Sequence, residues 1–110
     1  MRFGFILAFS GLVAVSGHAL AEESLNVYNW SDYIAEDTIA NFEAETGIKV
    51  TYDMYDSNEV LEAKMLAGSS GYDLVVPTAD FLARGREAGA YRDMDLSKIP
   101  NASNQDPEIQ

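Results

Sequence analysis

The sequence contains no cysteine, one histidine and few basic residues. Without cysteine, the 110-residue chain has no disulfide framework and no thiolate metal site. Its only histidine, His18, excludes a histidine-based catalytic triad and a histidine-rich metal site. Against 18 acidic residues the chain has 7 basic ones, a formal net charge of -11, so it lacks a basic face for nucleic acid phosphates. The acidic balance instead favours cationic partners.

Residues 1–21 have the three parts of a secretory signal peptide. Arg2 precedes an apolar stretch over residues 3–15, and the sequence ALA at residues 19–21 supplies a small-residue cleavage site. The alternative is an uncleaved membrane anchor, but this apolar stretch is shorter than the roughly 20 residues that cross a bilayer. We therefore expect export, followed by cleavage that also removes His18.

The mature part, residues 22–110, alternates between two hydrophobic patterns that predict three strands and three helices. The strands are expected at residues 25–30, 48–55 and 72–77, and the helices at about 36–46, 56–68 and 80–88. Gly47 and Gly89 are placed to close the first and third helices. Asp56 and Glu59 have the spacing of a capping box for the second helix.

This succession, with its short connections, predicts an α/β fold in which helices cover both faces of a parallel sheet. The second strand alternates like an exposed edge strand, with its apolar face formed by Ile48, Val50, Tyr52 and Met54. The apolar run at 74–76 is typical of a strand covered on both faces. The order 2-1-3 satisfies both patterns and places Trp30 at the carboxyl end of a central strand, where such sheets bind ligands. Because the sheet keeps an open edge and a small core, we expect a truncated protein.

The four residues after the first strand are the most informative for function. They are Trp30, Ser31, Asp32 and Tyr33. Aromatic faces attract ammonium groups by about 0.5–2 kcal/mol each, and a carboxylate adds charge-assisted hydrogen bonds. The combination indicates a pocket for an alkyl ammonium compound. On local pattern alone, however, buried rings and a helix-capping Asp32 are the more common arrangement.

A second candidate group follows the third strand. Thr78 offers a hydroxyl to the crevice and Asp80 a second negative charge, although both are also suited to capping the third helix, and for Asp80 the cap is favoured. Asp73 lies near the other end of this strand, where a structural or solvated role is expected. The acids at positions 53, 56, 59 and 62 lack the spacing and glycine of a calcium loop, so no metal or cofactor is expected.

Several segments together resemble one known family. They are YNWSDYI, FEAETGIKV, DSNEVLEAK, GYDLVVP and LSKIPN, all within residues 25–101. This stretch is similar to the N-terminal part of the periplasmic polyamine-binding proteins, the putrescine- and spermidine-binding components of ATP-driven importers. The resemblance implies a two-lobed protein of the periplasmic-binding-protein type II fold. Residues 22–110 would supply only the first β-α-β-α-β-α portion of lobe 1.

The resemblance also implies roles for individual residues. The positions that line the polyamine cleft in the family match Trp30, Ser31, Asp32 and Tyr33. There the rings lie on the alkyl chain and the acid lies near an amine. The position matching Thr78 is usually a serine that reaches the ligand, and threonine keeps that hydroxyl. Asp80 departs from the family pattern at a position that bears on which polyamine is preferred.

We therefore expect a periplasmic solute-binding component of an ABC importer, not an enzyme, that delivers putrescine or spermidine to a permease in the inner membrane. The full-length protein is expected to be a monomer. Three alternatives stay open. The first is a receptor for another small cationic or zwitterionic solute, and the second is an exported enzyme on the same scaffold that uses Asp32 or Asp80 for acid–base chemistry. The third is a nonfunctional product of a truncated reading frame.

Overall fold

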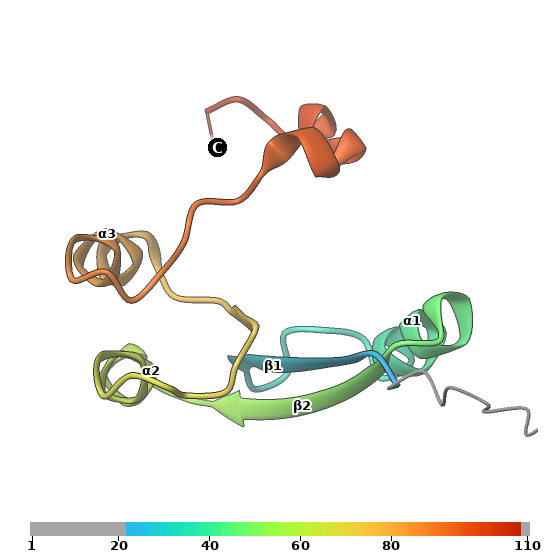
Figure 1. Cartoon of the computed structure of the whole chain (residues 1–110), viewed down its shortest axis with the longest axis horizontal. Coiled ribbons are helices and arrows are strands. Elements are labelled where there is room, and N and C mark those ends of the chain that lie inside the picture. The colour runs from blue at the N-terminus through green and yellow to red at the C-terminus, as the bar shows by residue number, and fades with distance from the viewer. Residues whose placement is uncertain (1–21, 109–110) are drawn as a thin grey trace, which may run out of the picture.

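The computed structural model describes residues 22–108 (Figure 1). The predicted signal peptide at 1–21 therefore lies outside the described residues. None of the helices within 22–108 has the length and apolarity needed to span a bilayer.

A three-stranded parallel sheet organises this part of the chain. Its strands are β1 (Ser24–Trp30), β2 (Lys49–Tyr55) and β3 (Leu74–Val75), hydrogen-bonded in the order β2-β1-β3. The predicted strand order is thus confirmed. β2 pairs with β1 along its whole length, so that Trp30 lies in register with Tyr55 at the carboxyl end.

β3 is much shorter than the strand predicted at 72–77, because side chains replace ladder hydrogen bonds at both of its ends. Before the strand, Oδ2 of Asp73 accepts a hydrogen bond from the backbone N–H of Asn26 at 2.8 Å. After it, the carbonyl oxygen of Val76 accepts side-chain hydrogen bonds from Trp30 and Tyr55. A structural role for Asp73, as expected from its position, agrees with this contact.

Three nine-residue helices alternate with the strands: α1 (Thr38–Thr46), α2 (Asn58–Leu66) and α3 (Ala79–Glu87). Gly47 closes α1 as predicted, in a left-handed conformation with φ 74° that lets its N–H bond to the carbonyl of Glu43. The capping box predicted for α2 is wrong. Ser57 is the N-cap, since its backbone is still extended and its Oγ accepts from the N–H of Val60 at 3.3 Å.

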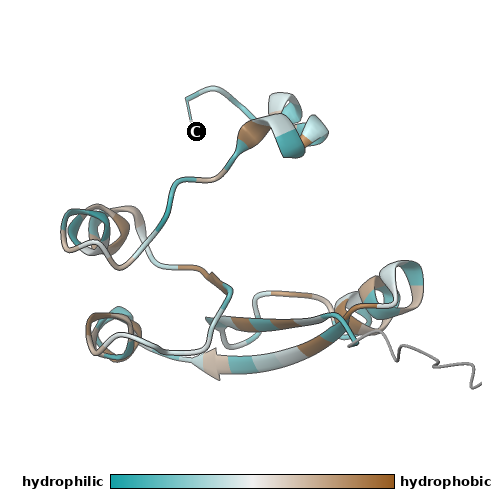
Figure 2. Cartoon of the chain, in the orientation of Figure 1, coloured by the Kyte–Doolittle hydropathy of each residue, from teal (hydrophilic) through white to brown (hydrophobic). Residues whose placement is uncertain are grey.

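The chain beyond α3 ends in two short 3-10 helices, η1 (Leu96–Lys98) and η2 (Pro100–Asn104). They contact each other and no other described helix or strand. Figure 1 shows them apart from the sheet, at the end of the extended stretch that follows α3, and Figure 2 shows apolar residues on this segment as well. The 3-10 segment therefore adds nothing to the packing of the sheet.

The packed core is small and largely aromatic. Tyr28 of β1, Tyr55 of β2 and Leu61 of α2 form its buried centre. Leu61 and Met65 share one face of α2, as predicted, and Met65 packs against this centre. The alternation predicted for β2 fails at its end, where Met54 is 60% exposed and Tyr55 only 4%. Tyr55 is buried because α2 packs on the face of the sheet that carries Tyr28.

The predicted cover on both faces of β3 is missing among residues 22–108. Leu74 is 49% exposed, and it lines a hollow of about 1000 Å³ between β3 and the carboxyl ends of α2 and α3. β3 is also the second edge of the sheet. β1 is thus the central strand, as predicted, whereas the cover expected on both faces of β3 is not supplied by this part of the chain.

α3 is held against α2 by one ion pair and lies against the following segment through one glycine. The guanidinium of Arg84 donates two hydrogen bonds to the carboxylate of Glu62, at 2.9 and 3.1 Å. Gly85 is buried under the ring of Tyr91, and a Cβ at this position would lie 2.2 Å from a ring carbon. The close approach requires glycine.

We expect Gly85→Ala to lower the free energy of unfolding by about 1–3 kcal/mol, because overpacking forces the Tyr91 ring to move. Chemical denaturation of both forms measures the effect. In a Tyr91→Ala background the same substitution should become neutral or stabilising, since alanine favours helix over glycine by about 1 kcal/mol. Equal losses in the two backgrounds would contradict a clash with Tyr91.

Candidate functional site

The two aromatic side chains of the predicted cluster lie side by side at the carboxyl end of β1. The ring centroids of Trp30 and Tyr33 are 5.9 Å apart, with their planes inclined by 32°. Tyr33 is 66% exposed, whereas Trp30 is half-buried. Neither ring is withdrawn into the interior, so an apolar surface is open to solvent at this edge of the sheet.

Trp30 is also part of the packing of the fold. Its indole Nε1–H donates to the carbonyl oxygen of Val76 at 2.8 Å, and its ring centroid lies 4.7 Å from that of Tyr55. The buried amide of Asn29 fixes the adjacent backbone, since its Oδ1 accepts from the N–H of Trp30 at 2.8 Å. The indole N–H is therefore already hydrogen-bonded within the protein, and the face of the ring is the part that remains for a ligand.

Asp32 occupies a left-handed turn with φ 60°, a conformation that aspartate tolerates better than most residues. The residue is exposed and, within residues 22–108, its carboxylate has no hydrogen bond or ion pair. Asp37, not Asp32, is the N-cap of α1. The helix-capping interpretation of Asp32 is thus wrong, and its carboxylate is available to a ligand. Ser31 is exposed beside it, and its N–H donates to the carbonyl of Tyr55 at 3.2 Å.

Thr78 and Asp80 form a connected pair at the start of α3. Thr78 is the N-cap residue, yet its Oγ1 donates to Oδ1 of Asp80 at 2.6 Å instead of accepting a helix N–H. Its own N–H donates to Oδ1 of Asn58 at 3.1 Å, which ties the start of α3 to that of α2. The hydroxyl of Thr78 lowers the pKa of the Asp80 carboxyl, and Arg84 lowers it further. Both residues are exposed, and Asp80 stands in the first turn of α3, where a negative charge suits the helix dipole.

The two predicted groups are joined through one carbonyl. Val76 precedes Thr78 by two residues, and its oxygen holds the indole of Trp30. The carboxyl ends of β1 and β3 are thereby fixed to each other. Sequence reasoning missed two contributors here, the backbone of Val76 and the side chain of Tyr55. Tyr55 could have been found from its place at the end of β2, in register with Trp30.

Two tyrosines below this surface have raised pKa values for different reasons. Burial raises the pKa of Tyr55 to about 12. The hydrogen bond that Tyr72 donates to Oδ2 of Asp53, at 2.6 Å, raises the pKa of Tyr72 to about 12. Both phenols therefore stay protonated in the fold at a pH where a free tyrosine ionises.

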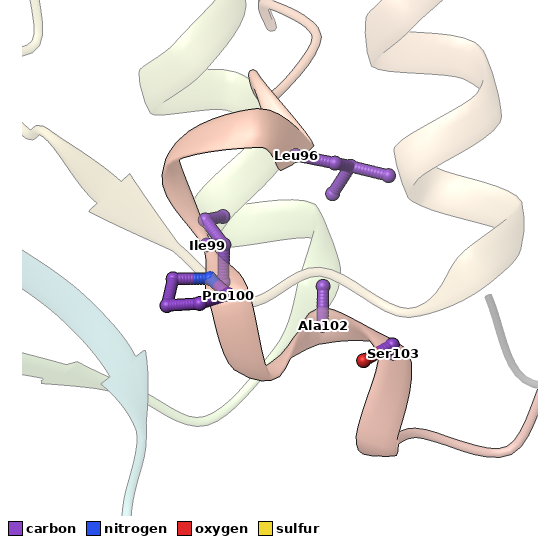
Figure 3. Close-up of a pocket in the computed structure, with 5 residues that line it drawn as sticks. All are labelled: Leu96, Ile99, Pro100, Ala102 and Ser103. Carbon is purple, nitrogen blue, oxygen red and sulfur yellow. The ribbon is translucent and has the colours of Figure 1, made fainter.

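Two hollows found among the described residues lie away from this cluster. The large one beside β3 and a smaller one of about 330 Å³, lined by residues of η1 and η2 and the intervening Ile99 (Figure 3), include none of Trp30, Ser31, Asp32 and Tyr33. Among the described residues there is also no group of three histidine, cysteine or acidic side chains that could hold a metal. The candidate site is an open surface of rings and one free carboxylate.

Comparison with known proteins places this arrangement in context. The chain is 59% identical over 105 residues to the putrescine-binding periplasmic protein PotF of Escherichia coli, and 55% identical over 111 residues to the putrescine-binding periplasmic protein SpuD of Pseudomonas aeruginosa. The chain is a homologue of the periplasmic polyamine-binding proteins. The matches cover 94% and 98% of this chain but only 28% and 30% of these relatives. No family model matches the chain.

Solved structures of homologues confirm the fold. The spermidine/putrescine substrate-binding protein PotD of Streptococcus pneumoniae superimposes with a TM-score of 0.76 at 34% identity, over 80% of this chain and 27% of that one. The TpPotD lipoprotein of Treponema pallidum gives 0.75 at 40% identity, over 79% and 27%. The sheet and its helices thus correspond to a fragment of the periplasmic-binding-protein fold.

The raised tyrosine pKa values predict a loss of stability at alkaline pH. Unfolded tyrosines ionise near pH 10, so the contributions of Tyr55 and Tyr72 are complete below about pH 10 and are lost as the pH rises towards 12. Denaturant unfolding between about pH 8 and pH 12, a range that brackets the pKa of a free tyrosine, measures this slope. Tyr72→Phe should flatten the slope, and an unchanged slope in this variant would contradict the assignment to Tyr72.

Proposed function

We propose that this chain forms part of a periplasmic solute-binding component of an ABC importer, which binds putrescine or spermidine and delivers it to the membrane permease. The observation that carries the proposal is the free carboxylate of Asp32 beside the open ring pair of Trp30 and Tyr33. Export through residues 1–21, a periplasmic location and the assignment of residues 22–110 to the first lobe belong to the same proposal.

The chemistry of the surface suits an amine with an aliphatic stem. The indole N–H of Trp30 is already bonded to Val76, so the ring contributes its face and no free donor. Aromatic faces attract cations and cover methylene groups, and the carboxylate of Asp32 accepts hydrogen bonds from an ammonium group. An anionic ligand would meet a negative charge on a chain whose formal net charge is already -11. A polyamine satisfies the rings and the acid together.

The homologues support the same ligand class. PotF and SpuD are named as putrescine-binding, and a further relative from Salmonella typhimurium, 40% identical over 95 residues, is named as spermidine/putrescine-binding. We propose that Thr78 and Asp80 contact the second amine of the ligand. The hydroxyl oxygen of Thr78 and the carboxylate of Asp80, which are hydrogen-bonded to each other, would both accept hydrogen bonds from that amine.

Calorimetric titration of the whole protein with putrescine and spermidine tests the proposal. Saturable binding, with the amine recovered unchanged afterwards, supports a receptor. Conversion of the amine would instead favour an exported enzyme that uses Asp32 or Asp80. Titration with arginine and with a zwitterionic amino acid, run alongside, distinguishes a polyamine receptor from a receptor for another small cationic or zwitterionic solute.

In the whole protein, we expect Asp32→Asn to weaken putrescine binding about 10- to 100-fold, because a hydrogen bond to a charged group contributes about 1.5–3 kcal/mol. Asparagine also tolerates the left-handed turn, so the thermal midpoint should change little. Glu36→Gln is the matched control, since it removes one exposed charge from the same connection. Unchanged affinity in Asp32→Asn, or equal losses in the two variants, would rule out a direct contact.

Residues 22–110 alone are expected to bind polyamines more weakly than micromolar. Micromolar affinity requires about -8.2 kcal/mol, whereas two rings and one exposed acid supply only a few kcal/mol before the cost of association. A facing surface must provide the remainder. Equilibrium dialysis of the isolated segment against putrescine measures the affinity, and micromolar binding would show that no second surface is needed.

A further inference from the structure

The carboxyl ends of all three strands meet at the carbonyl oxygen of Val76. Trp30 at the end of β1 donates to it through Nε1 at 2.8 Å, and Tyr55 at the end of β2 donates to it through its hydroxyl. A carbonyl oxygen has two lone pairs, so these two donors saturate it. The hydroxyl of Tyr55 and the indole of Trp30 are therefore held at neighbouring positions around one atom.

The ring of Tyr55 packs against two other rings. It is 4% exposed, and its centroid lies 4.7 Å from that of Trp30 and 4.7 Å from that of Tyr28. The interplanar angles are 54° and 59°, the tilted arrangement that aromatic pairs favour. Tyr28 and Leu61 of α2 share its buried cluster, so the Tyr55 ring is held in the core beside the indole.

Tyr55 also holds the backbone of the turn that carries the free acid. Its carbonyl accepts the N–H of Ser31 at 3.2 Å, one residue before Asp32. One residue thus contacts the indole through its ring, the acceptor of the indole through its hydroxyl, and the turn through its main chain. No other residue in the described part of the chain combines these contacts.

We propose that Tyr55 is a positioning residue, which fixes the tilt of the Trp30 ring and so the orientation of the face that receives the ligand. The inference rests on the proposed polyamine function. It deepens that function because Tyr55, buried beneath the surface, acts without touching the ligand. Removal of the ring would leave a space beside the indole into which Trp30 can move, and the indole face would then no longer lie along the methylene chain of an amine held by Asp32.

Tyr55→Leu in the whole protein tests the proposal, with Tyr72→Leu as the matched control. Tyr72 belongs to the same aromatic cluster, stacked on Tyr28 at 4.5 Å, but has no ring contact with Trp30. The measurements are the dissociation constant for putrescine, the thermal midpoint, and the fluorine NMR resonance of fluorotryptophan at position 30, assigned by its loss in Trp30→Phe.

We expect Tyr55→Leu to weaken putrescine binding about three- to tenfold, the range that corresponds to one aromatic pair, and to shift the Trp30 resonance. Tyr72→Leu should lower the thermal midpoint comparably, because it also removes a ring from the core, and leave both affinity and resonance near their original values. Equal losses of affinity in the two variants, or an unmoved Trp30 resonance in Tyr55→Leu, would overturn the proposal.

Tyr55→Phe keeps the ring and separates its role from that of the hydroxyl. It should restore affinity to within about threefold of the original protein, and its Trp30 resonance should move because Val76 loses one donor. This variant tests the positioning role of Tyr55 even if Tyr55→Leu does not fold. An unmoved Trp30 resonance in Tyr55→Phe would contradict a carbonyl of Val76 shared by Trp30 and Tyr55. A protein that binds no polyamine refutes the proposed function alone, because the resonances still report whether Tyr55 positions Trp30.

Discussion

The carbonyl oxygen of Val76 accepts one hydrogen bond from the indole of Trp30 and one from the hydroxyl of Tyr55, and the site depends on this shared acceptor. β3 contributes only two residues to the sheet ladder, so side chains supply much of what joins its carboxyl end to the other strands. The same contacts determine which part of Trp30 remains for a ligand. A structural hydrogen bond at the indole edge and the proposed binding surface at the indole face can therefore belong to one side chain, so the role of Trp30 in the packing does not exclude the proposed ligand contact.

Much of the fold could be predicted from local patterns, because each of those patterns depends on residues that are close in sequence. The α/β class, the strand order and the stop at Gly47 follow from periodicity and from the backbone freedom of glycine. The capping box at Asp56 was wrong by one residue, since residue spacing alone does not show where an extended backbone turns helical. The length of β3 was also overestimated, because the hydrogen bonds of Asp73 and Val76 that shorten it join residues far apart in sequence.

The candidate site could be predicted in its residue types and only partly in its geometry. The position of Trp30 and Tyr33 at a carboxyl strand end follows from the topology. The burial of Tyr55 does not, because alternation assigned this residue to the outer face of an edge strand, and the packing of α2 against Tyr28 reverses that assignment. The pairing of Thr78 with Asp80 was missed for a similar reason, since either residue alone resembles a helix cap.

Because Asp32 occupies a left-handed turn, the charge of this surface can change while its backbone shape stays the same. Aspartate, asparagine and glycine are the residues that most readily adopt such a conformation. A single substitution can therefore replace a negative group with a neutral polar one, or with none, while the main-chain path between β1 and α1 is retained. Under the proposed function, such a substitution would change the charge that this surface presents to a ligand and leave the backbone around it as it is.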